Sequence, residues 1–174
     1  MRVNEKTRHV RDVTAGSDTI RVRRPFKVVR EEQRRFIRLE ISTPMSLKKI
    51  KDVEGNYWPQ GDWYVINGMI LNISAGGVLV DLDQAVDAGD VVSMHFILQE
   101  VEGLDRVLGL VKRSDIEPEG CLAGIEFISK EHLVDQFSQA EMDLLGKGYT
   151  NFDTSVREIL NRYVDREATS PGGV

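Results

Sequence analysis

The chain has 174 residues, of which 41% are hydrophobic, so it is long enough for one well-packed core with appendages. Its net charge of −5 and its pI near 5.3 argue against nucleic-acid binding by the whole molecule. Cys121 is the only cysteine, which excludes a disulfide framework and a thiolate metal cluster, and its strand-like surroundings predict a small buried residue.

No stretch of the sequence approaches the roughly 20 apolar residues that a membrane-spanning helix needs. Met1–Lys6 has no apolar run behind it, so this segment does not have the form of a signal peptide. From both observations we expect a cytoplasmic protein without a membrane span.

Charge is divided unevenly along the chain. Residues 1–38 contain 12 Lys and Arg against 5 Asp and Glu, whereas residues 39–174 contain 11 against 23. Residues 1–19 are polar without periodicity. Thr19–Val29 alternates, but Pro25 interrupts it, which predicts an edge strand or an extended lead-in. We therefore expect a basic N-terminal arm with a lead-in strand over residues 1–29.

Short hydrophobic stretches of strand character fill the middle of the chain, and turn residues such as Gly, Pro and Asn separate them. The expected strands cover residues 36–41, 44–50, 63–71, 77–82, 91–98, 106–113 and 121–128. Six or seven short strands at fairly even spacing predict an all-β fold, an antiparallel barrel or sandwich, over residues 30–130.

Helical signals come only after the last expected strand. Ser138–Glu141 has the form of a capping box before an apolar run that Gly146 ends, and Ser155–Glu158 has the form of a second box. Apolar residues at helical spacing follow the second box: Val156, Ile159, Leu160 and Tyr163. We expect helices over residues 131–166, packed on the barrel or on another subunit, and a flexible tail over residues 167–174.

Three arginines, Arg34, Arg35 and Arg38, stand within five positions where the first expected strand begins. Arginine is always charged at neutral pH and presents a planar fork of donors, so a cluster of arginines suggests an anionic partner. Phosphate is the most natural anion for this geometry. The alternative for the cluster taken alone is a solvated basic rim.

A second polar segment, Asn72–Gly77, lies between two expected strands. Asn72 and Ser74 can both donate and accept hydrogen bonds, while Gly76 and Gly77 allow positive φ and close approach of a ligand to the backbone. Such a corner can hydrogen-bond a nucleobase edge or a phosphate. The alternative is a turn whose side chain satisfies its own backbone.

Three segments, in this order and on an all-β background, resemble motifs of the PilZ family. They are Arg34-x-x-x-Arg38, Asn72-x-Ser74-x-x-Gly77 and Gly124-Ile125-Glu126-Phe127. The resemblance runs from about Val29 to Ile128. It implies a six-stranded antiparallel PilZ-like barrel with C-terminal helices, which binds cyclic diguanylate (cyclic di-GMP), a bacterial second messenger.

The resemblance also implies roles for single residues. Arg34 and Arg38 would hold the phosphates and stack on or hydrogen-bond a guanine. Asn72 and Ser74 would read the other side of a guanine, and Gly77 would give it space. Residues beside the motifs would supply additional contacts: Arg30, Gln33, Arg35 and Gly76.

The function expected from these motifs is that of a ligand-gated receptor, in which cyclic di-GMP orders the arginine segment and a downstream protein partner reads the ordered surface. The alternative is a PilZ-like adaptor that binds no nucleotide and acts only through protein contacts. We expect no enzyme, no metal and no cofactor, because His9, His95 and His132 are scattered without metal-ligand spacing. A monomer and a homodimer both stay open.

Aromatic residues gather in two pairs, Tyr57-Trp58 and Trp63-Tyr64. We expect them to cap one end of the barrel, with partner contact as the alternative.

Overall fold

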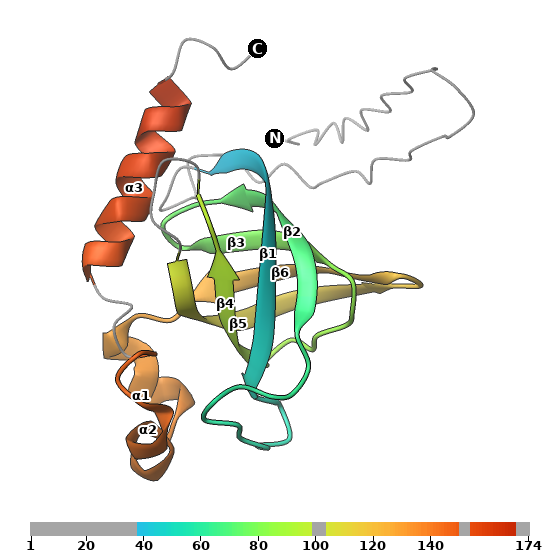
Figure 1. Ribbon diagram of the computed structural model, residues 1–174, viewed down its shortest axis with the longest axis vertical. Coiled ribbons are helices and arrows are strands. Elements are labelled where there is room, and N and C mark those ends of the chain that lie inside the picture. Colours follow the sequence, from blue (N-terminus) through green and yellow to red (C-terminus); the bar gives the residue numbers. More distant parts are fainter. Residues whose placement is uncertain (1–37, 99–103, 150–153, 170–174) are drawn as a thin grey trace, which may run out of the picture. The chain divides into compact units, whose positions relative to one another are not determined.

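Six strands of the computed structural model close into an antiparallel barrel, with helices beside and beneath it (Figure 1). The structure describes residues 38–98, 104–149 and 154–169, all within one unit that covers residues 35–174. The strands are β1 (Leu39–Lys51), β2 (Ile66–Ile73), β3 (Gly77–Leu82), β4 (Val91–Phe96), β5 (Leu104–Glu117) and β6 (Gly120–Phe127). The helices are the 3₁₀ turn η2 (Lys130–His132), α1 (Leu133–Gln136), α2 (Gln139–Leu145) and α3 (Thr154–Thr169).

The strands neighbour one another in the order β1-β2-β3-β6-β5-β4, and β4 pairs with β1 to close the ring. This confirms the prediction of a six-stranded antiparallel barrel followed by helices. The expected N-terminal arm and lead-in strand, residues 1–29, lie outside the described residues.

The strand β1 is continuous over 13 residues, so the prediction of two separate strands in this region was wrong. Its register against β2 shifts between Glu40 and Thr43, where the strand bends. Pairing with β4 begins only at Met45, so the missing N–H of Pro44 breaks no hydrogen bond between β1 and β4.

The other strand predictions differ from the structure mainly at their ends. β3 matches the predicted residues 77–82. β2 begins at Ile66 instead of Trp63, because the preceding residues belong to a loop. β5 runs to Glu117, beyond the predicted end at residue 113, since its last residues pair with β6 in a hairpin that turns at Gly120.

Two apolar clusters stabilise the fold. The larger one fills the barrel and includes one face of α3; its fully buried members include Leu47, Ile70, Val80, Met94 and Leu160. Tyr163 and Val164 extend this face of α3 onto the same cluster. The smaller cluster joins α1 and α2 to the strands, and its members include Ile50, Leu108, Leu133, Phe137 and Leu145. Cys121 is buried in the barrel, as predicted.

The helix boundaries test the two predicted capping boxes. Ser138 accepts from the Glu141 backbone N–H, the Glu141 carboxylate accepts from the Ser138 N–H, and Gly146 ends α2 at φ 76°, so the first box is confirmed. The second box was wrong, because α3 begins at Thr154 and Ser155 lies inside it. Residues 167–169 belong to α3 and not to a tail.

Candidate functional site

The polar corner between β2 and β3 lies next to the start of β1. Leu39 pairs with Ile73 and Glu40 pairs with Asn72 in the antiparallel register. Continuing this register by one residue puts the exposed Arg38 opposite Ser74. Arg38 and the corner therefore share one end of the barrel wall. The other predicted ligand residues before β1, which are Arg30, Gln33, Arg34 and Arg35, lie outside the described residues.

Ser74 is buried, and its hydrogen bonds stay within the turn that it forms with Gly76 and Gly77. Its backbone N–H donates to the Gly77 carbonyl at 2.9 Å, and its Oγ accepts from the Gly76 N–H at 3.2 Å. The Oγ also lies 3.5 Å from the Gly77 carbonyl oxygen, to which it donates. These hydrogen bonds hold the corner in its conformation. Ser74 therefore has the alternative role that the sequence allowed, that of a turn serine that satisfies its own backbone.

Gly77 is required by the packing of β3 on β6. A Cβ at this position would come within 2.2 Å of the Ile125 carbonyl oxygen and 3.1 Å of the Glu126 Cα. The neighbouring Gly76 carbonyl accepts from the Phe127 N–H at 2.9 Å. The segment 124–127 therefore packs against the corner and hydrogen-bonds to it. This contact gives a structural reason why the Asn72–Gly77 motif and the Gly124–Phe127 motif occur in one chain.

Asn72 is half-buried and lies on the outer face of β2, because it alternates with the buried Ile73. Glu40, its exposed partner on β1, shares that face. Glu126 is paired with Gly77 across β3 and β6, is also exposed, and lies 3.9 Å from the Lys112 ammonium. Two carboxylates thus flank the corner. Sequence reasoning missed them because the faces of β1 and β6 follow only from the register.

Histidines and carboxylates also lie elsewhere on the described part of the barrel. No group of three or more His, Cys, Asp or Glu within the described ranges has the arrangement of metal ligands. His95 is half-exposed, with Nδ1 at 3.3 Å from an Asp105 carboxylate oxygen. None of the helices that the structure describes is long and apolar enough to cross a membrane.

The aromatic residues of the loop between β1 and β2 divide into two kinds. Tyr57 packs against Phe137 with ring centroids 5.8 Å apart and donates to the Glu141 carbonyl at 2.6 Å. Burial and the nearby Glu141 carboxylate raise the pKa of Tyr57 to about 12. Trp63 and Tyr64 are instead 92% and 70% exposed. The prediction of a barrel cap was wrong for Trp63 and Tyr64, whereas Tyr57 is packed, but against the smaller cluster with the helices and not against the barrel interior.

A closed six-stranded antiparallel barrel with a glycine-containing corner at one end of its wall defines a small all-β domain. The sequence matches the family model of the PilZ domain over residues 30–139, and the chain belongs to the PilZ family. PilZ domains are binding and adaptor domains, not enzymes.

Solved structures that resemble this chain include one protein from Bacillus subtilis and one from Escherichia coli. The Bacillus subtilis inhibitor of motility (MotI/DgrA) is 16% identical with a TM-score of 0.47, and the alignment covers 78% of this chain and 51% of that protein. The PilZ domain of Escherichia coli YcgR, solved with c-di-GMP, is 13% identical with a TM-score of 0.43, and covers 78% of this chain and 94% of that domain. This chain thus spans about half the length of the Bacillus protein. No curated protein matches it in sequence.

Proposed function

We propose that this PilZ protein is a receptor for the bacterial second messenger cyclic di-GMP and passes the binding signal to a protein partner. The proposed ligand-binding residues are Arg34, Arg38, Asn72, Ser74 and Gly77. The observation that carries the proposal is the β1–β2 register, which brings Arg38 to the same end of the barrel as the corner.

The chemistry of the ligand fits these residues. Cyclic di-GMP carries two anionic phosphates and two flat guanine bases, and arginine serves both as a bidentate donor and as a planar stacking partner. Each charge-assisted hydrogen bond contributes about 1.5–3 kcal/mol, so a few of them are enough for about micromolar binding after the ordering cost. Further donors at Arg30, Gln33, Arg35 and Gly76 would add to this.

The carboxylates beside the corner set a condition on binding. Glu40 and Glu126 are exposed on the face that would receive the ligand, and they repel an anion there. Cationic groups must therefore outweigh them, which is the role we propose for the pair Arg34 and Arg38. Cyclic di-GMP would neutralise these arginines and order the segment that carries them, and the partner would read the ordered segment.

Calorimetric titration with cyclic di-GMP tests the proposal. We expect Arg38→Ala to weaken binding by roughly tenfold to a hundredfold, as expected for the loss of one charge-assisted contact. Arg162→Ala is the matched control, because Arg162 is an exposed arginine on α3. Equal heats for the wild-type protein and Arg38→Ala would end the proposal.

A second function, that of an adaptor without nucleotide binding, is favoured by one observation at the same corner. The Ser74 hydroxyl and the space beside Gly77 are already used by the turn and by β6. Hydrogen exchange separates the two functions. A receptor gains protection over residues 25–40 when cyclic di-GMP is added, whereas an adaptor shows no change there.

A further inference from the structure

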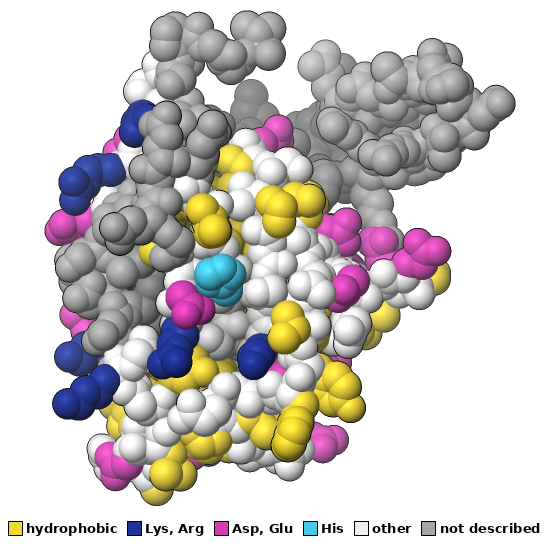
Figure 2. Space-filling view, viewed as in Figure 1, with side chains coloured by type: hydrophobic (Ala, Val, Ile, Leu, Met, Phe, Trp, Pro, Cys, Tyr) yellow, Lys and Arg dark blue, Asp and Glu magenta, His cyan; other side chains and the backbone are white. Residues whose placement is uncertain are grey.

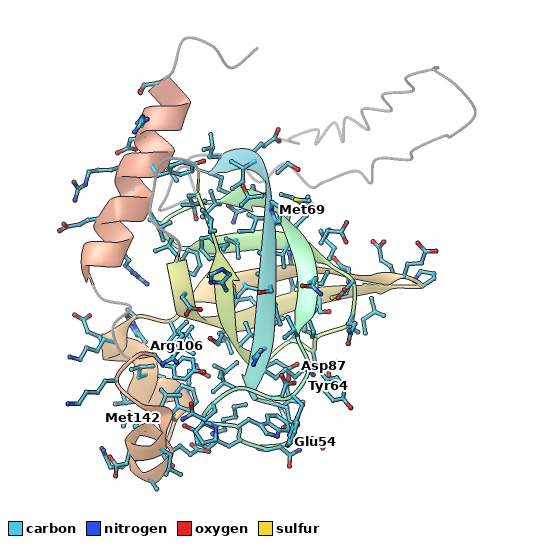
Figure 3. The ribbon with its side chains drawn as sticks, viewed as in Figure 1. Glu54, Tyr64, Met69, Asp87, Arg106 and Met142 are labelled. Atoms are coloured by element: carbon cyan, nitrogen blue, oxygen red, sulfur yellow. The ribbon has the colours of Figure 1, made fainter. Side chains whose placement is uncertain are left out.

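The far end of the barrel, where β1 ends and β2 begins, exposes an unusual set of apolar side chains. Trp63 is 92% exposed and Tyr64 is 70% exposed, and Val53 and Val65 beside them are also exposed. Large aromatic side chains at this level of exposure, gathered in one loop, mark contact sites more often than single exposed residues do. Figure 3 shows Glu54, Tyr64 and Asp87 together at this end, away from Met69 on β2.

The loop that carries Trp63 is held rigidly by its own hydrogen bonds. The Asp52 carboxylate accepts from the Glu54 and Asn56 backbone N–H groups at 3.0 and 2.9 Å. Farther along, the Asp62 N–H donates to the Lys49 carbonyl at 2.9 Å, and the Lys49 N–H donates back to the Asp62 carboxylate at 3.2 Å. The exposed aromatic side chains therefore stand on an ordered base, which reduces the entropy that a binding partner must overcome.

A second loop, residues 83–90 between β3 and β4, lies against the first. A Cβ on Gly89 would meet the Val53 side chain at 2.8 Å, so the two loops touch there. Residues of both loops line one groove: Asp52, Trp58, Asp62, Trp63 and Tyr64 from the first, and Gln84 and Ala85 from the second. The aromatic side chains and this groove form one continuous surface.

The surface is strongly acidic. Residues 52–65 and 83–90 contain no Lys or Arg, and they contain six carboxylates: Asp52, Glu54, Asp62, Asp83, Asp87 and Asp90. The only lysine that lines the groove, Lys49, is bound to the buried Asp90 at 2.9 Å. Five carboxylates thus remain in the two loops, and two of them, Asp52 and Asp62, line the groove with Trp63 and Tyr64. The Lys48 side chain lies against the first loop at Gly61 and offsets one of these charges. Figure 2 shows hydrophobic and acidic side chains near one another at the lower right of the face in view.

We propose that this surface, Asp52–Val65 with Asp83–Asp90, is the docking site for a basic segment of a partner protein. An arginine or lysine side chain would lie over the Trp63 ring as a cation–π contact, and neighbouring basic residues would pair with the surrounding carboxylates. The same charges repel nucleic acid, anionic lipid and acidic peptides. The inference rests on the proposed function for its signalling role, whereas binding of the segment does not require the nucleotide.

The probe is a short synthetic peptide of alternating arginine and serine, titrated calorimetrically against the full chain, with a glutamate–serine peptide of equal length as the charge control. We expect only the arginine peptide to bind, and to bind less tightly as salt is raised. Trp63→Ala should weaken binding by about tenfold, from the loss of a cation–π contact. Asp83→Asn with Asp87→Asn should weaken it a few-fold and reduce the salt dependence.

Two matched controls lie on the β5–β6 hairpin. Ile116→Ala removes another exposed apolar side chain, and Glu119→Gln removes another exposed carboxylate. Both should leave peptide affinity unchanged. Because Trp63 is so exposed, Trp63→Ala should also leave the free energy of unfolding unchanged within about 0.5 kcal/mol, so its effect on binding is not an effect on folding.

Several results would overturn the proposal. Equal affinity of wild-type and Trp63→Ala protein for the arginine peptide is one, and binding of the glutamate peptide is another. Acrylamide quenching of the two tryptophans identifies other occupants: shielding of Trp63 at every protein concentration means that another part of this chain covers the site, and shielding that grows with concentration means a second copy. Cyclic di-GMP binding should be unchanged in Trp63→Ala, so the two proposals can fail separately.

Discussion

The two ends of the barrel differ in what accounts for their residues. At the Asn72–Gly77 corner the fold itself accounts for the residue types. The contact with Ile125 leaves no room for a side chain at Gly77, and the Ser74 hydroxyl accepts a hydrogen bond within the turn. At the far end the backbone is equally well ordered, yet it presents Trp63 and Tyr64 to solvent, where folding gains nothing from them. The fold thus explains the residues at the corner, whereas only the partner contact that we propose explains Trp63 and Tyr64.

Charge sharpens the contrast. The corner lies opposite Arg38, one residue before β1. In the sequence, residues 1–38 have a net excess of seven positive charges. The far end gathers six carboxylates in two loops. Under the two proposals, one domain binds an anion at the corner and a cationic segment at the far end. Because charged surfaces steer encounter, we expect the two ends to bind ligands of opposite charge.

The largest effect we expect is on the ion pair beneath the far end. Lys49→Met removes the ammonium that lies 2.9 Å from the Asp90 carboxylate, whose side chain is fully buried. An unpaired buried carboxylate costs about 3–5 kcal/mol, so urea unfolding should show a loss of this size. Adding Asp90→Asn to Lys49→Met should restore most of it, because the buried charge is then gone. Lys112→Met, at an exposed pair, should cost less than about 1 kcal/mol.

An intermediate effect is expected at the corner. Gly77→Ala puts a methyl group 2.2 Å from the Ile125 carbonyl, so β3 must move away from β6. We expect a loss of about 1–3 kcal/mol in the free energy of unfolding, measured by thermal or urea unfolding. Gly124→Ala is the control, because its methyl group would meet only the movable Arg113 side chain at 3.1 Å. Equal losses in the two variants would show that the corner does not depend on this contact.

The smallest effect concerns the anchor of the aromatic loop. Tyr57→Phe removes the hydrogen bond to the Glu141 carbonyl and should cost about 1 kcal/mol. The raised pKa of Tyr57, about 12, means that the folded state holds this proton more tightly than the unfolded state. The resulting stabilisation is complete below pH 10 and disappears as pH rises from 10 to 12. Between pH 10 and pH 12, the free energy of unfolding should therefore fall less steeply in Tyr57→Phe than in the wild-type protein. A residual loss is expected from Tyr149, whose pKa burial also raises.

Much of the fold could be predicted because local signals and tertiary structure agree. The β3 strand and the Ser138 capping box follow from alternation and from a short-range hydrogen-bond pattern, and both were found where predicted. The two-strand prediction for β1 failed because Pro44 reads as a break in sequence. Only the barrel register shows that β4 pairing starts at the next residue.

The candidate site was predictable to a lesser degree. The Asn72-x-Ser74-x-x-Gly77 motif lies at a corner between β2 and β3, and its ligand-binding role stays a prediction. The packing role of Gly77 could not be predicted, because it depends on β6, which lies nearly 50 residues away in sequence. The exposure of Trp63 and Tyr64 was also hidden, because an apolar run before a strand is normally part of it. Here the run begins in the loop, since the hydrogen bonds between Lys49 and Asp62 hold it there.

The closed ring of strands limits how any other molecule can attach. Every strand of the barrel has a neighbour on both sides along most of the wall. Unused backbone donors and acceptors onto which a foreign strand could be grafted therefore lie at strand ends, such as the start of β1, before Met45, and the end of β5, beyond Val111. Along the paired wall another molecule therefore meets side chains, and we propose binding at the two rims. For this domain, single substitutions at those rims can separate one molecular association from another while the scaffold stays intact.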